Sequence, residues 1–218
     1  MKIIFIMMAS IIMNNFAHEC TLKVFTGTAI HEIMPLVIEE RNKEFRNYPY
    51  LYVHEANNDY NYDNFLCNND KAIIVVAYHD EKAIGYVTGV PLTHFLGHDH
   101  YPHAKDAWEN TNLNSNDYFY TADGIIFSQK DRHHGILKKL YAAFEEQFRL
   151  LGYTHNCFVT ESHDEHPLKP KDYYELSKIW EHNGYTKLPF PIIMYWPTLQ
   201  ADGSIINEYQ HELFFWIK

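Results

Sequence analysis

The chain has 218 residues, a formal net charge of −10, 46% hydrophobic residues and 21% charged residues. This length suits one large domain, and the composition is that of a globular rather than a disordered protein. The acidic excess argues against binding to nucleic acid, because such binding needs Lys and Arg to neutralise phosphates. The three cysteines are too few and too scattered for a disulfide framework, which favours a reducing compartment.

The first 18 residues form an apolar leader. Lys2, an apolar run over residues 3–13 and then the small Ala17 follow the order of a secretory signal peptide. The run is shorter than the ~20 apolar residues that span a bilayer. Two interpretations stay open, a cleaved export signal and a retained extension that packs on the protein. Residues 19–218 are expected to form a single domain, which is cytoplasmic unless the leader directs export.

The first part of this domain predicts a strand, a helix and a loop. The stretch TLKVFTG, residues 21–27, has the alternation of a strand. Residues 28–48 carry apolar side chains at helical spacing, and Pro35 is expected to kink or divide that helix. The aromatic, Asn-rich residues 48–65 are expected to form a loop or a short helix.

Two apolar runs around the polar sequence HDEK predict a β-hairpin over residues 71–92, with a four-residue loop at 79–82. The histidine-rich residues 93–117 are expected to form a helix or a long surface loop. Residues 118–127, YFYTADGIIF, then read as the next strand.

The C-terminal half predicts two further helices and more strands. Apolar residues at three- and four-residue spacing predict a helix over residues 135–151 with one face in the core. Residues 155–161, HNCFVTE, predict a strand, and residues 171–184 a helix closed by Gly184. The aromatic tail predicts additional strands or a packed terminal helix. This order predicts an α/β (α+β) fold in which helices flank a mixed central sheet.

The junction SQKDRHHGILKKLY, residues 128–141, joins a strand to a helix. The first amides of a helix lack intrahelical partners, and with the positive end of the helix dipole they can hold an anion. Arg132 adds a cation, and Gly135 adds a residue without a side chain. A pyrophosphate would suit such a junction, although a plain strand-to-helix turn needs no ligand.

Arg-His-His-Gly-Ile-Leu at this junction resembles the Q/R-x-x-G-x-G/A motif of the GNAT superfamily of N-acyltransferases. The stretches YPYLY, TGVPL, IWEHNGY and FFWIK resemble one bacterial branch of that superfamily, so that the likeness covers about residues 22–218. It implies a GNAT-like fold with a β-α-β core that binds acetyl-CoA as co-substrate. The residues it implies for the cofactor are Ile126, Phe127, Ser128, Arg132, His133, His134, Gly135, Ile136, Leu137 and Lys138.

Three positions depart from the family pattern. Leu137 stands where Gly or Ala is usual, so acetyl-CoA binding depends on whether its side chain points into the core. Trp180 replaces a tyrosine that serves as general acid, and indole cannot donate a proton usefully. Gly124 stands where the related branch has a glutamate, with Asp123 beside it. Asp123 would face the wrong side of the strand unless a bulge re-aims it.

The resemblance implies transfer of an acetyl group to a primary amine by direct attack on the thioester. Asp123 is the first candidate base and Glu161 the second, while Tyr174 or its neighbour Tyr173 is the candidate donor to the leaving thiolate. The acceptor could be a small amine, a peptide N-terminus or a lysine side chain. No nucleic acid and no stable membrane span are expected, and the aromatic C-terminal strands would suit a sheet-edge homodimer.

Three other readings stay open. The departures fit a catalytically degenerate binding or scaffold protein on the same fold, which could be exported. A zinc site could form if two histidine-rich segments meet, the candidate ligands being His98, His100, His103, His163 and His166. An aromatic ligand-binding module is the third reading, with a tyrosine cluster at Tyr48, Tyr50, Tyr52, Tyr60 and Tyr62. No metal is included in the preferred interpretation.

Overall fold

A computed structural model of the chain describes residues 20–54, 64–98, 101–132, 134–161, 167–173 and 176–218. The apolar leader lies outside these residues. The strands are β1 (Thr21–Thr26), β2 (Ile73–His79), β3 (Lys82–Pro91), β4 (Tyr118–Ile126), β5 (His155–Glu161), β6 (Thr186–Leu199) and β7 (Ile205–Ile217). The helices are α1 (Ile30–Phe45), α3 (Leu92–Leu96), α4 (Pro102–Glu109), α5 (Ile136–Leu150) and α6 (Leu176–His182).

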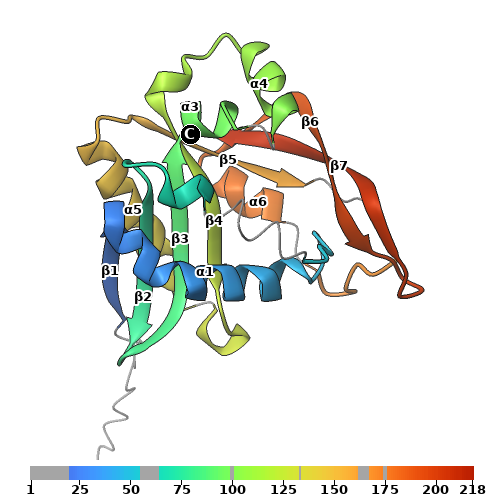
Figure 1. Ribbon diagram of the computed structural model, residues 1–218, viewed down its shortest axis with the longest axis horizontal. Coiled ribbons are helices and arrows are strands. Elements are labelled where there is room, and N and C mark those ends of the chain that lie inside the picture. Colours follow the sequence, from blue (N-terminus) through green and yellow to red (C-terminus); the bar gives the residue numbers. More distant parts are fainter. Residues whose placement is uncertain (1–19, 55–63, 99–100, 133, 162–166, 174–175) are drawn as a thin grey trace, which may run out of the picture.

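Within the described residues, the strands form one seven-stranded sheet in the order β1-β2-β3-β4-β5-β7-β6 (Figure 1). All neighbouring strands are antiparallel except β4 and β5, which are parallel and are connected through α5. The predicted α/β (α+β) fold, a mixed sheet flanked by helices with a β-α-β unit, is therefore confirmed.

The two faces of the sheet carry separate layers of core. Successive residues of a strand face opposite sides, and along β2 the side chains of Ile74 and Val76 join the core under α1 and α3. The alternate residues, Ile73 and Val75, pack under α5 with Phe144. Figure 1 shows α1 lying across β1 to β4 on one face.

Several local predictions need correction. Pro35 lies inside α1 and does not divide it. The β2–β3 hairpin turns over two residues rather than four, because His79 pairs with Lys82 and Asp80 adopts a φ of 52°. Such two-residue turns need a left-handed residue, which Asp tolerates. Of the two structures expected for the aromatic tail, additional strands or a terminal helix, the strands form, as β6 and β7.

The sheet opens between β4 and β5. These strands pair only where Tyr118–Tyr120 face His155–Cys157, and beyond that point they are not hydrogen-bonded to each other. Asn156 closes the end of the paired part: its amide donates to the Thr121 hydroxyl at 2.8 Å and accepts from the Tyr185 hydroxyl at 2.9 Å. The two strands are therefore unpaired with each other on the C-terminal side of Tyr120.

A β-bulge in β4 decides which residues face this opening. Thr88 of β3 pairs with Asp123, but the next residue, Gly89, pairs with Thr121, so Ala122 is the extra residue. The bulge reverses the alternation, and Asp123 therefore lies on the same face as Tyr120, with its amide hydrogen-bonded to the Thr88 hydroxyl at 3.2 Å. The bulge that Asp123 would need in order to face this side of the sheet is therefore present.

Three further expectations concern the sheet edge, the cysteines and a membrane span. Strand β6 is an edge strand that contains Pro189, Pro191 and Pro197, and proline cannot donate to a further strand. The cysteines at positions 20, 67 and 157 are free thiols. No helix among the described residues is long and apolar enough to cross a bilayer. The sheet-edge homodimer stays a prediction.

Candidate functional site

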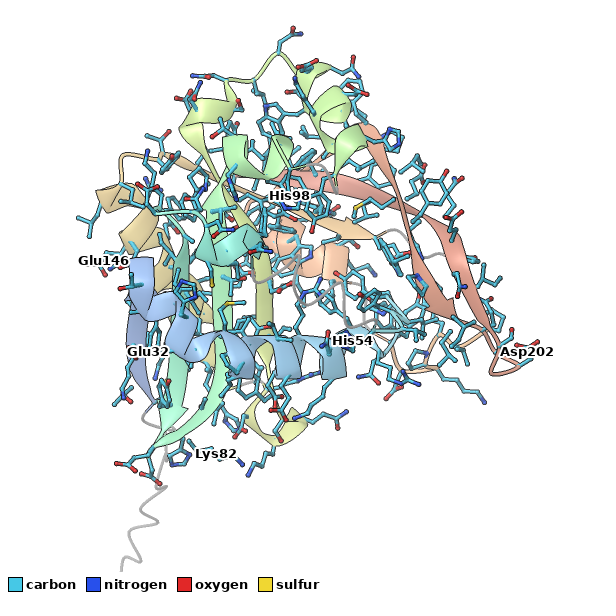
Figure 2. All side chains as sticks on the ribbon, viewed as in Figure 1. Glu32, His54, Lys82, His98, Glu146 and Asp202 are labelled. Atoms are coloured by element: carbon cyan, nitrogen blue, oxygen red, sulfur yellow. The ribbon has the colours of Figure 1, made fainter. Side chains whose placement is uncertain are left out.

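A cavity of about 230 Å³ lies on the α1 face of the sheet, where β4 and β5 part. Most of its wall is aromatic or aliphatic, and its charged side chains are Arg41 from α1 and Asp123 from β4. Figure 2 labels His98, which follows α3 and also lines the cavity. The remaining lining residues are Phe45, Tyr50, Tyr52, Phe65, Tyr101, Tyr120, Ala122, Val159, Met194, Tyr195, Trp196 and Leu213.

The Asp123 carboxylate is held by Arg41. The distance from Arg41 Nε to Asp123 Oδ2 is 3.3 Å, and the side chain of Asp123 is only 3% exposed. The guanidinium of Arg41 stacks on Phe45, with its Cζ 4.5 Å from the ring centroid. An ion pair withdrawn from water in this way costs desolvation energy, so it is weak evidence for stability and stronger evidence for a function.

A second carboxylate, Glu161, lies on the same face of β5 as Val159 but outside the cavity wall. It forms a buried hydrogen-bonded ion pair with His211 Nδ1. His211 Nε2 lies 2.7 Å from the Thr198 hydroxyl, which itself donates to the Trp196 carbonyl at 3.0 Å. A hydroxyl has one proton, so Nε2 is the donor to Thr198, and one further proton lies between His211 and Glu161. Burial raises the pKa of Glu161 to about 7, against the opposing effect of His211.

Tyr50 has a buried hydroxyl that feels the charges of both carboxylates. Burial raises the pKa of its hydroxyl, and the charges of Glu161 and then Asp123 raise it further. The segment that carries Tyr50 is fixed to β6, because Trp196 Nε1 donates to the Tyr50 carbonyl at 3.1 Å and Tyr52 bridges Thr198. Trp196 also stacks on His211, with ring centroids 3.4 Å apart. The cavity wall and the Glu161–His211 pair are thus one packed unit.

The junction predicted to hold a phosphate is the N-terminus of α5. Gly135 precedes the helix with a φ of 74°, a left-handed conformation that favours glycine, and no side chain caps the helix. The first helical hydrogen bond is from Lys139 N to the Gly135 carbonyl, so the amides of residues 136–138 have no intrahelical acceptor. Lys138 beside them is exposed. The chemistry of this terminus fits an anion.

Leu137 was the departure of greatest concern. Its side chain is partly buried and packs against the core cluster beneath α5, together with Leu22 and Tyr141. Ile136 is fully buried in the same cluster. Tyr141 in turn reaches β4: a Cβ at Gly124 would lie 2.8 Å from the Tyr141 hydroxyl. Gly124 is therefore explained by packing against Tyr141.

Arg132 makes a contact that the sequence did not suggest. Its Nη2 lies 3.0 Å from both carboxylate oxygens of Glu44 on α1 and 3.3 Å from the Ile126 carbonyl. Both side chains are about one-third exposed, at 38% and 37%. The cation predicted to meet a phosphate is therefore engaged by a carboxylate, and it connects the junction to α1.

The other predicted residues fall into three groups. Ile126 is buried, Phe127 packs edge-on against Tyr86, and Ser128 is half-buried. His134 is exposed, and its ring contacts the Lys130 carbonyl at 3.1 Å. His133 and Tyr174 lie outside the described residues.

Two aromatic residues of the predicted catalytic region pack on neighbours. Tyr173 packs edge-on against Tyr48, with ring centroids 4.7 Å apart. Trp180 packs on Phe158 at 4.8 Å. Neither lines the cavity, so among the predicted catalytic residues that the structure describes, Asp123 alone lies on that wall.

The sequence did not single out Arg41, Trp196 or His211. Arg41 lies in a polar stretch of α1 beside other charged residues, and Trp196 lies in the aromatic tail, so neither stands out locally. Tyr50 and Tyr52 of the predicted tyrosine cluster do line the cavity, whereas Tyr60 and Tyr62 lie outside the described residues. The stretch YPYLY, which contains Tyr50 and Tyr52, was the sequence signal for this part of the cavity wall.

The histidines give no metal site in the part of the chain that the structure describes, where no three His, Cys, Asp or Glu side chains gather in a suitable group. His98 packs edge-on against Phe65 at 5.3 Å, and His103 is exposed on α4. His100, His163 and His166 lie outside the described residues.

The sequence alone finds no relative: no protein-family model matches the chain, and no curated protein matches it. Solved structures do match. A protein from Desulfovibrio desulfuricans described as a GNAT-family acetyltransferase has a TM-score of 0.53 at 12% identity, covering 92% of this chain and 98% of that one.

Two enzymes that acetylate ribosomal-protein alanine are also similar in structure. The ribosomal-protein-alanine N-acetyltransferase from Brucella melitensis has a TM-score of 0.51 at 15% identity, covering 90% of this chain and 98% of that one. The ribosomal-protein-S18-alanine N-acetyltransferase from Escherichia coli has a TM-score of 0.51 at 8% identity, covering 90% and 92%. The protein therefore has the fold of the GNAT acetyltransferases, as its sequence motifs indicated.

Proposed function

We propose that the protein is an acetyl-CoA-dependent N-acetyltransferase that transfers an acetyl group to a primary amine. The observation that carries this proposal is the position of Asp123, a buried carboxylate on the wall of a cavity lined mostly by aromatic and aliphatic side chains, at the opening between β4 and β5. The same strand continues into the junction that leads to the uncapped N-terminus of α5. An acceptor site and an anion site thus lie along one strand.

The residues at the junction fit the diphosphate of acetyl-CoA. The amides of residues 136–138 and the α5 dipole would hold the phosphates, with Lys138 adding positive charge. Leu137 supports rather than blocks this arrangement, since its side chain packs toward the core. Acetyl-CoA supplies the activated acetyl group, and this chain supplies its orientation and the proton transfers.

The reaction requires one bond exchange and one proton transfer. The neutral amine nitrogen bonds to the acetyl carbonyl carbon, the carbon–sulfur bond breaks, and the sulfur leaves with the electron pair. The proton lost by nitrogen passes to Asp123 as general base and ends on the sulfur. We retain Tyr174 as the candidate donor to sulfur, and a backbone amide at the opening of β4 as the candidate oxyanion donor. Glu161 is a reserve base, because it is not on the cavity wall.

The first experiment is calorimetric titration of acetyl-CoA into the protein, its Gly135→Asp variant and a Gly203→Asp control. Gly135 and Gly203 have φ values of 74° and 84° and no atom within 4 Å of an added Cβ, so aspartate strains both alike. Gly203 follows Asp202 at the far tip of the β6–β7 hairpin (Figure 2), away from α5. We expect a micromolar Kd that Gly135→Asp weakens at least tenfold and the control leaves unchanged.

The opposite result has a clear meaning. If the folded protein does not bind acetyl-CoA, the enzyme proposal fails. The scaffold reading is then preferred, with the Glu44–Arg132 pair closing the anion site.

A further inference from the structure

The cavity carries one positive and one negative side chain, and this charge pattern restricts its ligand. Arg41 and Asp123 face the cavity together, and their contact is through Nε of the guanidinium at 3.3 Å. This distance is longer than the 2.7–2.9 Å of the strongest charge-assisted hydrogen bonds between arginine and a carboxylate. His98 also lines the wall. The charged part of the wall is therefore a neutral pair rather than an acidic patch.

A simple cationic amine would match only half of this pair. Its ammonium would meet Asp123, but the guanidinium of Arg41 would then lie beside a second positive charge. A zwitterion matches both halves, because its ammonium can face Asp123 while its carboxylate faces Arg41. In an α-amino acid the nitrogen and the carboxyl carbon are two bonds apart, roughly 2.5 Å. That spacing is comparable to the 3.3 Å between the two protein groups.

The rest of the wall defines the remainder of the ligand. The rings of Tyr50, Tyr52, Tyr120 and Trp196 and the side chain of Leu213 surround the ion pair. The volume of about 230 Å³ is below the ~300–1,000 Å³ of pockets for drug-sized ligands. One apolar or aromatic side chain therefore suits the space, and an aromatic ring there could stack or pack edge-on against the rings of the wall.

We propose that the acceptor is a free α-amino acid with an apolar or aromatic side chain, bound as a zwitterion between Asp123 and Arg41. This inference rests on the proposed function and narrows it. The α-nitrogen is then placed at the general base, on the strand that borders the opening. A peptide N-terminus lacks the neighbouring carboxylate, and Arg41 selects against it. A polyamine is disfavoured by the same arginine.

The test compares ligands that differ only in the carboxylate. Calorimetry without acetyl-CoA uses L-phenylalanine and L-phenylalaninamide, and L-leucine serves as a smaller apolar probe. We expect L-phenylalanine to bind at least tenfold more tightly than its amide. Arg41→Met should lower L-phenylalanine affinity at least tenfold and should not weaken binding of the amide, which loses only a repulsive neighbour. Arg46→Met, at the end of the same helix and outside the cavity wall, is the control.

Two outcomes overturn the inference. One is equal binding of L-phenylalanine and its amide, or no binding of any of the three probes. The other is an equal loss for both ligands in Arg41→Met, which would show that Arg41 only supports the fold. Acetylation is followed separately by release of free thiol. An acetyl-CoA complex that acetylates other amines but not amino acids rejects this inference and keeps the proposed function, whereas absence of acetyl-CoA binding rejects the function itself.

Discussion

Asp123 and Glu161 are both buried carboxylates on the α1 face of the sheet, but their partners differ. Arg41 contacts Asp123 on the cavity wall, whereas His211 holds Glu161 behind Trp196. A guanidinium favours the ionised carboxylate, while burial favours the neutral acid. Environments of this kind separate two carboxyl groups into different roles. We propose that Asp123 acts as the base and that Glu161 positions the cavity wall.

Asp123→Asn tests the base. The amide keeps the size of the side chain but cannot accept the proton, so kcat/KM for the amine should fall by about 10²–10⁴. The Kd for acetyl-CoA should stay within threefold, because the α5 terminus is unchanged. Asp117→Asn, at the exposed start of β4, is the control. Retention of more than a tenth of the activity in Asp123→Asn would exclude Asp123 as the base.

Glu161→Gln tests the buried pair through the pH dependence of stability. The pKa of Glu161 is raised from 4.5 to about 7 in the folded protein, so the folded state binds this proton more tightly than the unfolded state. Its contribution to stability is complete below about pH 4.5 and is lost as the pH rises through about 7. Urea unfolding should show that, as the pH rises across this window, the wild type loses up to about 3 kcal/mol of unfolding free energy relative to Glu161→Gln. A difference in unfolding free energy that stays constant across this pH window would contradict the assignment.

At the scale of elements, α1 takes part in both candidate sites. Arg41 and Phe45 line the cavity one helical turn apart, while Glu44 of the same turn contacts Arg132 at the junction before α5. An anion that binds Arg132 in place of Glu44 would therefore break a contact of α1, the helix that contributes Arg41 and Phe45 to the cavity wall. The contact is half-exposed, so its strength is modest.

Glu44→Gln removes the carboxylate that competes for Arg132. A surface ion pair contributes up to about 1 kcal/mol, so acetyl-CoA affinity should rise by up to about fivefold. Glu39→Gln is the matched control, because Glu39 pairs with Lys43 on the same helix at 2.6 Å. Calorimetry at low and high salt measures the effect, and the gain should shrink with salt. A weaker Kd in Glu44→Gln would mean that the pair supports the binding conformation instead.

Local patterns predicted most elements of this fold, while the site depended on distant partners. The alternation in β4 and β5, the apolar stripe of α5 and the glycines at 135 and 184 are signals within a few residues. The bulge at Ala122 depends on how β3 pairs with β4, and nothing in YFYTADGIIF marks it. Arg41 meets Asp123 across 82 positions of sequence, a contact that no local pattern contains.

The whole molecule consists of two half-sheets that meet along a short seam. One half consists of strands β1–β4, which α1 and α5 cover. The other half consists of β5 and the long hairpin formed by β6 and β7 (Figure 1). Tyr118–Tyr120 and His155–Cys157 are the strand residues that join them. The cavity takes walls from both halves, since Asp123 belongs to one and Trp196 to the other.

This seam has a consequence for amide hydrogen exchange. Units with few shared hydrogen bonds open independently, so the amides of β2–β3 and those of β5–β7 should report two different opening free energies. Native-state exchange followed by mass spectrometry measures both, and a single common value would contradict the division. A ligand bound in the cavity, whose walls come from both halves, should bring the two values together. The ligand would then make the two halves open together, although the hydrogen-bonded pairing between β4 and β5 stops part of the way along the strands.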